Sequence, residues 1–353
     1  MFDFVSNRPA DFGRVRKALL LQGEPDYVPQ GELWIDNTIM SKFLGRQVNT
    51  WCEDTEEIIE FWHRAGYDYA HIVPTYRFPK LSDNAEEIGY GSQTAVDEHT
   101  GMINSWEDFE HYQWPKVESI DYGPVERAIK ILPEGMKLIS GTFEGVFEVS
   151  WMIMGFETFA LKLIEDPELV RAVVNNVGTF MLNLVENVAE IEGIGAIWHS
   201  DDIAYKTSTM LAPSAYRELT FPWYRKIVAT AKKKDLPAIY HSDGYLWEVM
   251  DDLVDIGFNA IHPIEPLGMD INDLHAAYGD KLCLMGNIGL EYELTMGTPD
   301  DVDKKVKERI ETIGPGGGYI CGSSNSIANY VPFENFVALI TAIQKYGKYF
   351  HSG

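Results

Sequence analysis

Residues 238–266 read AIYHSDGYLWEVMDDLVDIGFNAIHPIEP, and this stretch contains the pattern that decides the fold. Two short apolar runs, at 238–241 and 260–263, enclose a segment with the character of an amphipathic helix. Nearly continuous apolar runs are typical of parallel strands that are covered on both faces. A strand, a helix and a second strand in this order predict a right-handed crossover between parallel neighbours.

The same alternation of apolar run and helix recurs along the chain. Residues 167–190 carry apolar side chains at i, i+3 and i+4, and Asp166 followed by Pro167 is typical of a helix start, as is Thr298 followed by Pro299. Eight such units favour a closed barrel over an open sheet. We therefore expect an α/β fold, a single (β/α)₈ TIM-barrel domain over residues 1–353. Its strands are predicted at 32–35, 69–73, 137–140, 196–199, 238–241, 260–263, 282–286 and 318–321.

Composition narrows the possible partners. The 353 residues include 54 acidic and 29 basic side chains, a formal net charge of −25 that disfavours nucleic acids and anionic membranes as partners. The three cysteines form no CxxC pair or zinc-finger pattern, and no apolar run approaches the roughly 20 residues that span a bilayer. We expect a cytoplasmic protein with a small-molecule substrate. Whether it forms a homodimer is left open by the sequence. The apolar residues of 78–114 follow neither the helix period of about 3.6 residues nor the strand period of two. This segment is predicted to form an excursion over the barrel mouth.

In such barrels the active site lies on the loops that follow the strands. Polar or ionisable side chains follow six consecutive predicted strands, and the candidates among them are Glu144, Asp202, His241, Asp243, Glu265, Asn287 and Asn325. Trp34, within the first predicted strand, is a further candidate for the lining of the mouth. The carboxylates and histidines directly after apolar runs carry this prediction, because polarity alone is ordinary in loops.

His241 and Asp243 form the sharpest local pair. At positions i and i+2 of a strand end, both side chains can point the same way, which suits a divalent metal or an acid–base pair. Hydrogen bonds to neighbouring loop backbone are the alternative. Of the adjacent acids we prefer Asp202 to Asp201, which could instead cap a turn. His199, His262 and Cys321 are interpreted as structural.

Several motifs resemble one known family. The sequences HSDD at 199–202, HSDG at 241–244, GDKLCLMGNIG at 279–289 and GGYICGSSNSIANYVPFEN at 317–335 are similar to the uroporphyrinogen decarboxylase superfamily. The resemblance covers most of the chain from about residue 137 onward. It implies a (β/α)₈ barrel and either decarboxylation or methyl exchange with a corrinoid protein.

Departures from the family patterns bear on this choice. Where the haem-pathway decarboxylase has an arginine-rich signature, residues 31–36 offer acids and no arginine, so a polycarboxylate substrate would meet an anionic pocket. Thiol-methylating members bind zinc through a His-x-Cys pair and a distant Cys. Here His241 matches the histidine, but Asp243 and Asn325 stand at the cysteine positions. This pattern looks more like the members that demethylate methyl ethers, the O-demethylase type.

The sequence therefore predicts a methyltransferase that moves a methyl group from a small methoxylated donor to a corrinoid carried by a partner protein. His241, Asp243 and Glu265 are the expected ligands of a divalent metal, zinc first. His241, Glu265 and Asp202 are the expected catalytic residues, with Glu144, Asn287, Asn325 and Trp34 contacting substrate. Two alternatives stay open: a metal-free decarboxylase or lyase acting on a non-porphyrin acid, and a non-catalytic binding barrel.

Overall fold

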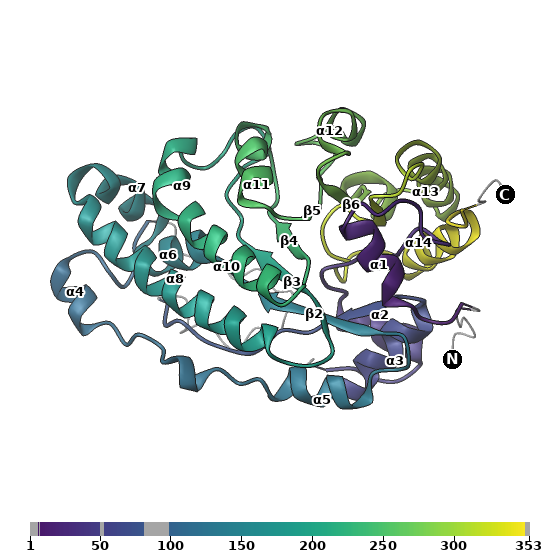
Figure 1. The fold of residues 1–353 in the computed structure, drawn as a ribbon, viewed down its shortest axis with the longest axis horizontal. Coiled ribbons are helices and arrows are strands. Elements are labelled where there is room, and N and C mark those ends of the chain that lie inside the picture. The colour runs from purple at the N-terminus through teal and green to yellow at the C-terminus, as the bar shows by residue number, and fades with distance from the viewer. Residues whose placement is uncertain (1–5, 7, 50–52, 81–98, 350–353) are drawn as a thin grey trace.

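The computed structural model describes residues 6, 8–49, 53–80 and 99–349. Seven parallel strands pair in chain order to form one curled sheet in the middle of the molecule (Figure 1). The strands are β1 (Tyr69–His71), β2 (Lys137–Thr142), β3 (Ile194–Ser200), β4 (Ala238–His241), β5 (Ala260–His262), β6 (Cys283–Ile288) and β7 (Tyr319–Ser323). The predicted parallel α/β architecture and seven of the eight predicted strands are confirmed.

Helices surround the sheet, and Figure 1 shows α6–α10 on one side of it and α12–α14 on the other. The α-helices are α1 (Phe12–Leu19), α2 (Asn37–Leu44), α3 (Thr55–Ala65), α4 (Trp106–His111), α5 (Gly123–Ile131), α6 (Val146–Met154), α7 (Phe156–Glu165), α8 (Pro167–Ala189), α9 (Pro213–Leu219), α10 (Phe221–Lys233), α11 (Met250–Ile256), α12 (Ile271–Tyr278), α13 (Pro299–Ile313) and α14 (Phe333–Tyr346). Single turns are formed by η2 (Val117–Ser119), η3 (Trp247–Val249) and η4 (Leu290–Leu294).

Two predicted helix starts are confirmed by their caps. Asp166 accepts a hydrogen bond from the Leu169 N–H at the start of α8, and Pro167 takes the first helical position. Thr298 and Asp301 form a reciprocal capping box at the start of α13. No helix among the described residues is both long and apolar enough to cross a bilayer.

The prediction of a regular strand at 32–35 is wrong. The segment 29–36 runs beside β7 with only two isolated parallel bridges, Gln30 to Cys321 and Ile35 to Ile327. On the β1 side, the Tyr69 hydroxyl accepts from the Glu32 N–H and donates to the Glu32 carbonyl, both at 2.8 Å. A side chain thus takes the hydrogen bonds that a neighbouring strand would supply, so no continuous ladder forms there.

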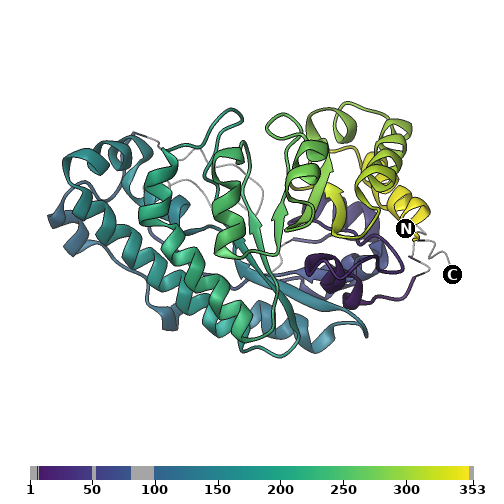
Figure 2. The ribbon, with the colours of Figure 1, turned by 45° about the horizontal axis from the view of Figure 1, so that its top comes forward.

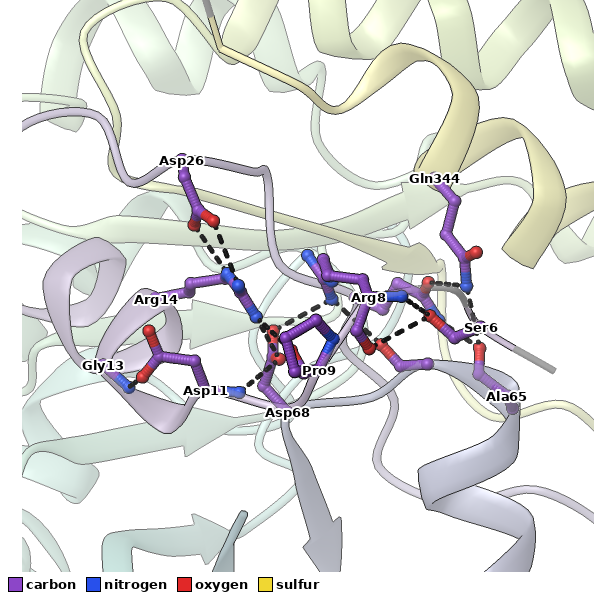
Figure 3. Close-up of polar contacts among 12 residues, drawn as sticks. Ser6, Arg8, Pro9, Asp11, Gly13, Arg14, Asp26, Ala65, Asp68 and Gln344 are labelled. Atoms are coloured by element: carbon purple, nitrogen blue, oxygen red, sulfur yellow. Dashed lines mark hydrogen bonds and ion pairs between the residues drawn. The ribbon is translucent and has the colours of Figure 1, made fainter. Parts of the chain in front are cut away.

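A buried ion-pair network ties the N-terminal segment to the residue just before β1 (Figure 3). Asp68, which is fully buried, accepts from Arg8 at 3.0 Å and from Arg14 at 2.9 Å. Arg14 also binds both carboxylate oxygens of Asp26, and the Asp11 N–H donates to Asp68. The first and last helices, α1 and α14, lie at the same end of the long axis in Figures 1 and 2.

The predicted excursion at 78–114 falls partly outside the described residues, because 81–98 are not among them. Of its described part, Met102 and Ile103 donate backbone hydrogen bonds to the Ile153 carbonyl in α6, and residues 106–111 form α4. A role as a lid stays a prediction.

Candidate active site and metal centre

The carboxyl ends of β3 and β4 bring three candidate residues together. Strand β3 ends at Ser200 and β4 at His241, so Asp202 and Asp243 lie on the loops just beyond them. Because the strands are parallel neighbours, with Ser200 in register with His241, these loops leave the same edge of the sheet.

His241 faces both carboxylates. Its Nε2 atom lies 3.8 Å from Asp202 Oδ1 and 3.8 Å from Asp243 Oδ1. The Asp243 N–H donates to Asp202 Oδ1 at 2.9 Å, which locks the two loops together. One potential ligand atom from each of the three residues lies within 4.8 Å of the others, the one such group of three found among the described residues.

Asp243 is oriented from the far side of the site. Its Oδ2 atom accepts a hydrogen bond of 2.6 Å from Asn325 Nδ2, on the loop after β7. Its Oδ1 atom is buried and has no hydrogen-bond partner among the described residues. A buried carboxylate oxygen without a partner is costly, and a cation would satisfy it. Asn325 was predicted to contact substrate; in the structure its amide positions Asp243.

The charges of this group favour a divalent cation. Burial raises the pKa of Asp202 to about 6. Burial, then the charges of Asp202 and Glu265, raise the pKa of Asp243 well above its usual range. Burial also lowers the pKa of His241 to about 3, so its imidazole is neutral at neutral pH, the form that binds metals. One imidazole nitrogen and two carboxylate oxygens are a suitable ligand set for zinc or a harder divalent ion.

Glu265 lies beside this group rather than in it. Its Oε2 atom accepts from the Gly244 N–H at 2.9 Å, so it braces the loop that carries Asp243. Burial is the main cause of its raised pKa, and Lys206 opposes that shift. The structure therefore places Asp202, and not Glu265, with His241 and Asp243 in the group of potential ligands.

Asp201, the neighbour of Asp202, points away into the protein. Its carboxylate accepts from the N–H groups of Phe147 and Glu148 at 2.8 Å and from the Tyr224 hydroxyl at 2.6 Å. Asp201 thus holds the N-terminal turn of α6. A Cβ atom at Gly145 would lie 2.1 Å from the Cγ atom of Asp201, so only glycine fits at position 145. The preference for Asp202 over Asp201 agrees with this geometry.

Glu148 is an acidic neighbour that the sequence did not reveal. Burial raises its pKa well above the usual range, and the charges of Asp202, Asp201 and Glu144 raise it further. It sits in the first turn of α6, where helical spacing alone says nothing of a site. The contact of Asp201 with this turn and a hydrogen bond from the Asp202 backbone N–H hold the Glu148 carboxyl beside the Asp202 loop.

His262 was interpreted as structural, yet its ring contacts His241 directly. The two Nδ1 atoms lie 2.7 Å apart, and the rings stack with centroids 5.0 Å apart. The signal in the sequence was a histidine at the end of both β4 and β5, which the register makes partners. His199, by contrast, bonds the Thr142 hydroxyl and stacks on Phe258, in accordance with its structural interpretation.

The other predicted substrate contacts are spread out. The Asn287 amide donates to the Ile264 carbonyl and accepts from Arg309 in α13, so both of its ends are engaged within the protein. Glu144 pairs with Lys80 at 2.6 Å. Trp34 lines a small cavity together with His71 and Trp62. The structure does not bring these three residues into the Asp202–His241–Asp243 group.

Comparison with known proteins agrees with the sequence motifs. The profile of the family described as Uroporphyrinogen decarboxylase (URO-D) matches residues 58–346. A uroporphyrinogen decarboxylase of Dechloromonas aromatica is 29% identical over 144 residues, 39% of each chain. The methylcobamide:CoM methyltransferase MtaA of Methanosarcina barkeri is 24% identical over 225 residues, 63% of each chain. The chain thus spans about two fifths of the length of the first of these relatives and less than two thirds of the second.

Among solved structures, a methyltransferase from Methanosarcina mazei has a similar fold. It superposes with a TM-score of 0.70 over 96% of this chain and 99% of its own, at 17% sequence identity. At that identity the likeness concerns the fold.

Proposed function

The chain belongs to the uroporphyrinogen decarboxylase family of enzymes, and from that premise we propose that it is a corrinoid-dependent methyltransferase. The methyl donor is a small methoxylated compound and the acceptor is a reduced corrinoid on a partner protein. The observation that carries the proposal is the grouping of one potential ligand atom from each of Asp202, His241 and Asp243 within 4.8 Å, with Asp243 Oδ1 left without a hydrogen-bond partner among the described residues. Methyl transfer in MtaA, a relative over 63% of the chain, supports it.

The proposed reaction breaks the bond between the methyl carbon and an oxygen of the donor. The electron pair of that bond stays on the oxygen, and the new bond to the methyl group takes its electron pair from the reduced acceptor. Leaving oxygen atoms of ethers are poor leaving groups, so the developing negative charge must be stabilised. A divalent cation bound at this site would supply a Lewis acid for that purpose.

The residues of this chain would act around that centre. Asp202, His241 and Asp243 would hold the cation, while Asn325 fixes the direction of Asp243 and Glu265 fixes its loop. His241 is neutral because burial lowers its pKa to about 3, which favours the role of ligand over that of proton donor. Glu265 has a raised pKa and is the better candidate to protonate the leaving oxygen.

We also propose that the curled sheet and segment 29–36 act together as an eight-part barrel within one domain. This segment contacts both β7 and the Tyr69 side chain of β1, the two edges of the sheet. The acids of this segment, however, do not line the site as the sequence suggested. Glu32 binds Ser323 and Asp36 caps α2, so the anionic character of the site comes from Asp202, Asp243 and their neighbours.

A decarboxylase is the second candidate, because uroporphyrinogen decarboxylases are among the similar proteins. A site with several carboxylates would repel a polycarboxylate substrate, so this candidate requires a substrate with few negative charges. It predicts release of carbon dioxide with neither corrinoid nor metal.

One assay separates the two candidates. Purified protein loaded with zinc is mixed with reduced cobalamin and a panel of methoxylated donors, and methylcobalamin is followed by absorbance. We expect methyl transfer that falls at least tenfold in Asp202→Asn. Asp235→Asn, a change of the same kind at an exposed position in the turn that precedes β4, is the control that keeps activity. Methyl transfer from no donor, or transfer that chelation leaves intact, would refute the proposed chemistry.

A further inference from the structure

The ring of His262 contacts the side of His241 that faces away from the two aspartates. The Nδ1 atoms of the two rings lie 2.7 Å apart, a short hydrogen bond. The rings are 27° from parallel, and their residues are 5% and 0% exposed. Since His241 and His262 are register partners on β4 and β5, the backbone of the sheet fixes this pairing.

Two neutral imidazoles can form this bond in only two ways. In one, His241 carries its proton on Nδ1 and donates to His262, which leaves a lone pair on His241 Nε2. In the other, His262 donates, and His241 carries its proton on Nε2. Only the first arrangement presents a lone pair to the space between Asp202 and Asp243.

The other nitrogen of His262 distinguishes the two arrangements energetically. Its Nε2 atom is buried and has no hydrogen-bond partner among the described residues. In the first arrangement this atom is an unpaired N–H, whereas in the second it is an unpaired lone pair. Among buried backbone groups an unpaired N–H is rarer than an unpaired C=O. In the second arrangement the His241 Nε2–H also faces the Asp202 and Asp243 carboxylates 3.8 Å away, whereas in the first a lone pair faces them. The second arrangement is therefore favoured until a ligand for His241 Nε2 compensates the difference.

We propose that His262 is a positioning residue that accepts the Nδ1 proton of His241 and thereby directs the Nε2 lone pair of His241 at a divalent cation held by Asp202 and Asp243. This inference rests on the metal site of the proposed function. Binding of the cation exchanges the tautomers of both rings, while both rings stay neutral. Partners that orient a ligating histidine in this way typically change metal affinity by about 10–100-fold when they are removed.

The test measures zinc binding rather than activity. His262→Leu removes the acceptor, while His262→Asn places an amide oxygen near the position of Nδ1. We expect His262→Leu to weaken zinc binding by about 10–100-fold in calorimetric titration, and His262→Asn to restore most of the affinity. The matched control is His199→Leu, which removes an equally buried histidine that bonds Thr142 instead of the site and should leave zinc affinity unchanged.

A second measurement does not depend on the stability of the variants. In ¹⁵N-histidine NMR of the unaltered protein, zinc should move the proton of His241 from Nε2 to Nδ1 and that of His262 from Nδ1 to Nε2. Zinc affinity of His262→Leu equal to that of the parent, or a His262 tautomer that zinc leaves unchanged, would overturn the positioning role and leave the metal site standing. A parent protein that binds no zinc would overturn both.

Discussion

Replacement of Asp243 by asparagine should affect stability and metal binding in opposite directions. Asparagine keeps the shape of the side chain and can still accept from Asn325 Nδ2, but it removes one of two carboxylates whose oxygens lie within 4.8 Å of each other. Coulomb's law with an effective dielectric constant of about 20 puts the repulsion between two such charges at about 3 kcal/mol. Because the Asp202 and Asp243 side chains are 38% and 31% exposed, water lowers this to about 1–3 kcal/mol.

Thermal unfolding with and without zinc tests both directions at once. With a chelator present, Asp243→Asn should unfold at a higher temperature than the parent, because the repulsion is gone. With zinc at about 100 times its Kd, the parent should gain about 2.7 kcal/mol of stability, since only the folded state offers the site. Asp243→Asn should gain little of this, because it lacks a charged ligand.

The control for this experiment is Asp235→Asn. The Asp235 side chain is 91% exposed and its backbone has a positive φ of 55°, which asparagine tolerates. It should respond to zinc as the parent does. The reasoning is refuted if Asp243→Asn is destabilised in the chelator, or if zinc stabilises it as much as it stabilises the parent.

Two further predictions concern groups outside the site. Asp68→Ala should lower the free energy of unfolding in urea by about 3–5 kcal/mol, because it leaves the buried guanidinium groups of Arg8 and Arg14 without their shared carboxylate; a loss below about 1 kcal/mol would contradict this. Glu32→Gln should remove a pH dependence of stability. Burial raises the pKa of Glu32 from 4.5 to about 8, so between these values the folded protein holds a proton that the unfolded chain has released. Stability should therefore fall more steeply in the parent than in the variant as pH rises through this window, by up to about 1.4 kcal/mol per pH unit. Parallel urea stabilities of the two proteins from pH 5 to pH 8 would exclude this effect.

The sequence alone was enough to predict the alternation of strands and helices and the loops that carry the site. Apolar runs bounded by polar residues are local features, and the seven strands that formed were all visible in them. Parallel connection then places every strand end at one edge, so His241, Asp202 and Asp243 could be predicted to lie near one another without coordinates.

Only the tertiary structure decided which way the side chains at that edge point. Asp201 and Asp202 are neighbours in sequence, yet one holds the start of α6 and the other faces His241. The segment 32–35 has the composition of a strand, but the hydroxyl of Tyr69 takes both backbone hydrogen bonds of Glu32. The pairing of His241 with His262 depends on the register between β4 and β5. These outcomes depend on contacts between residues far apart in the chain. The sequence around each residue does not show which of these contacts form or how much they stabilise the fold.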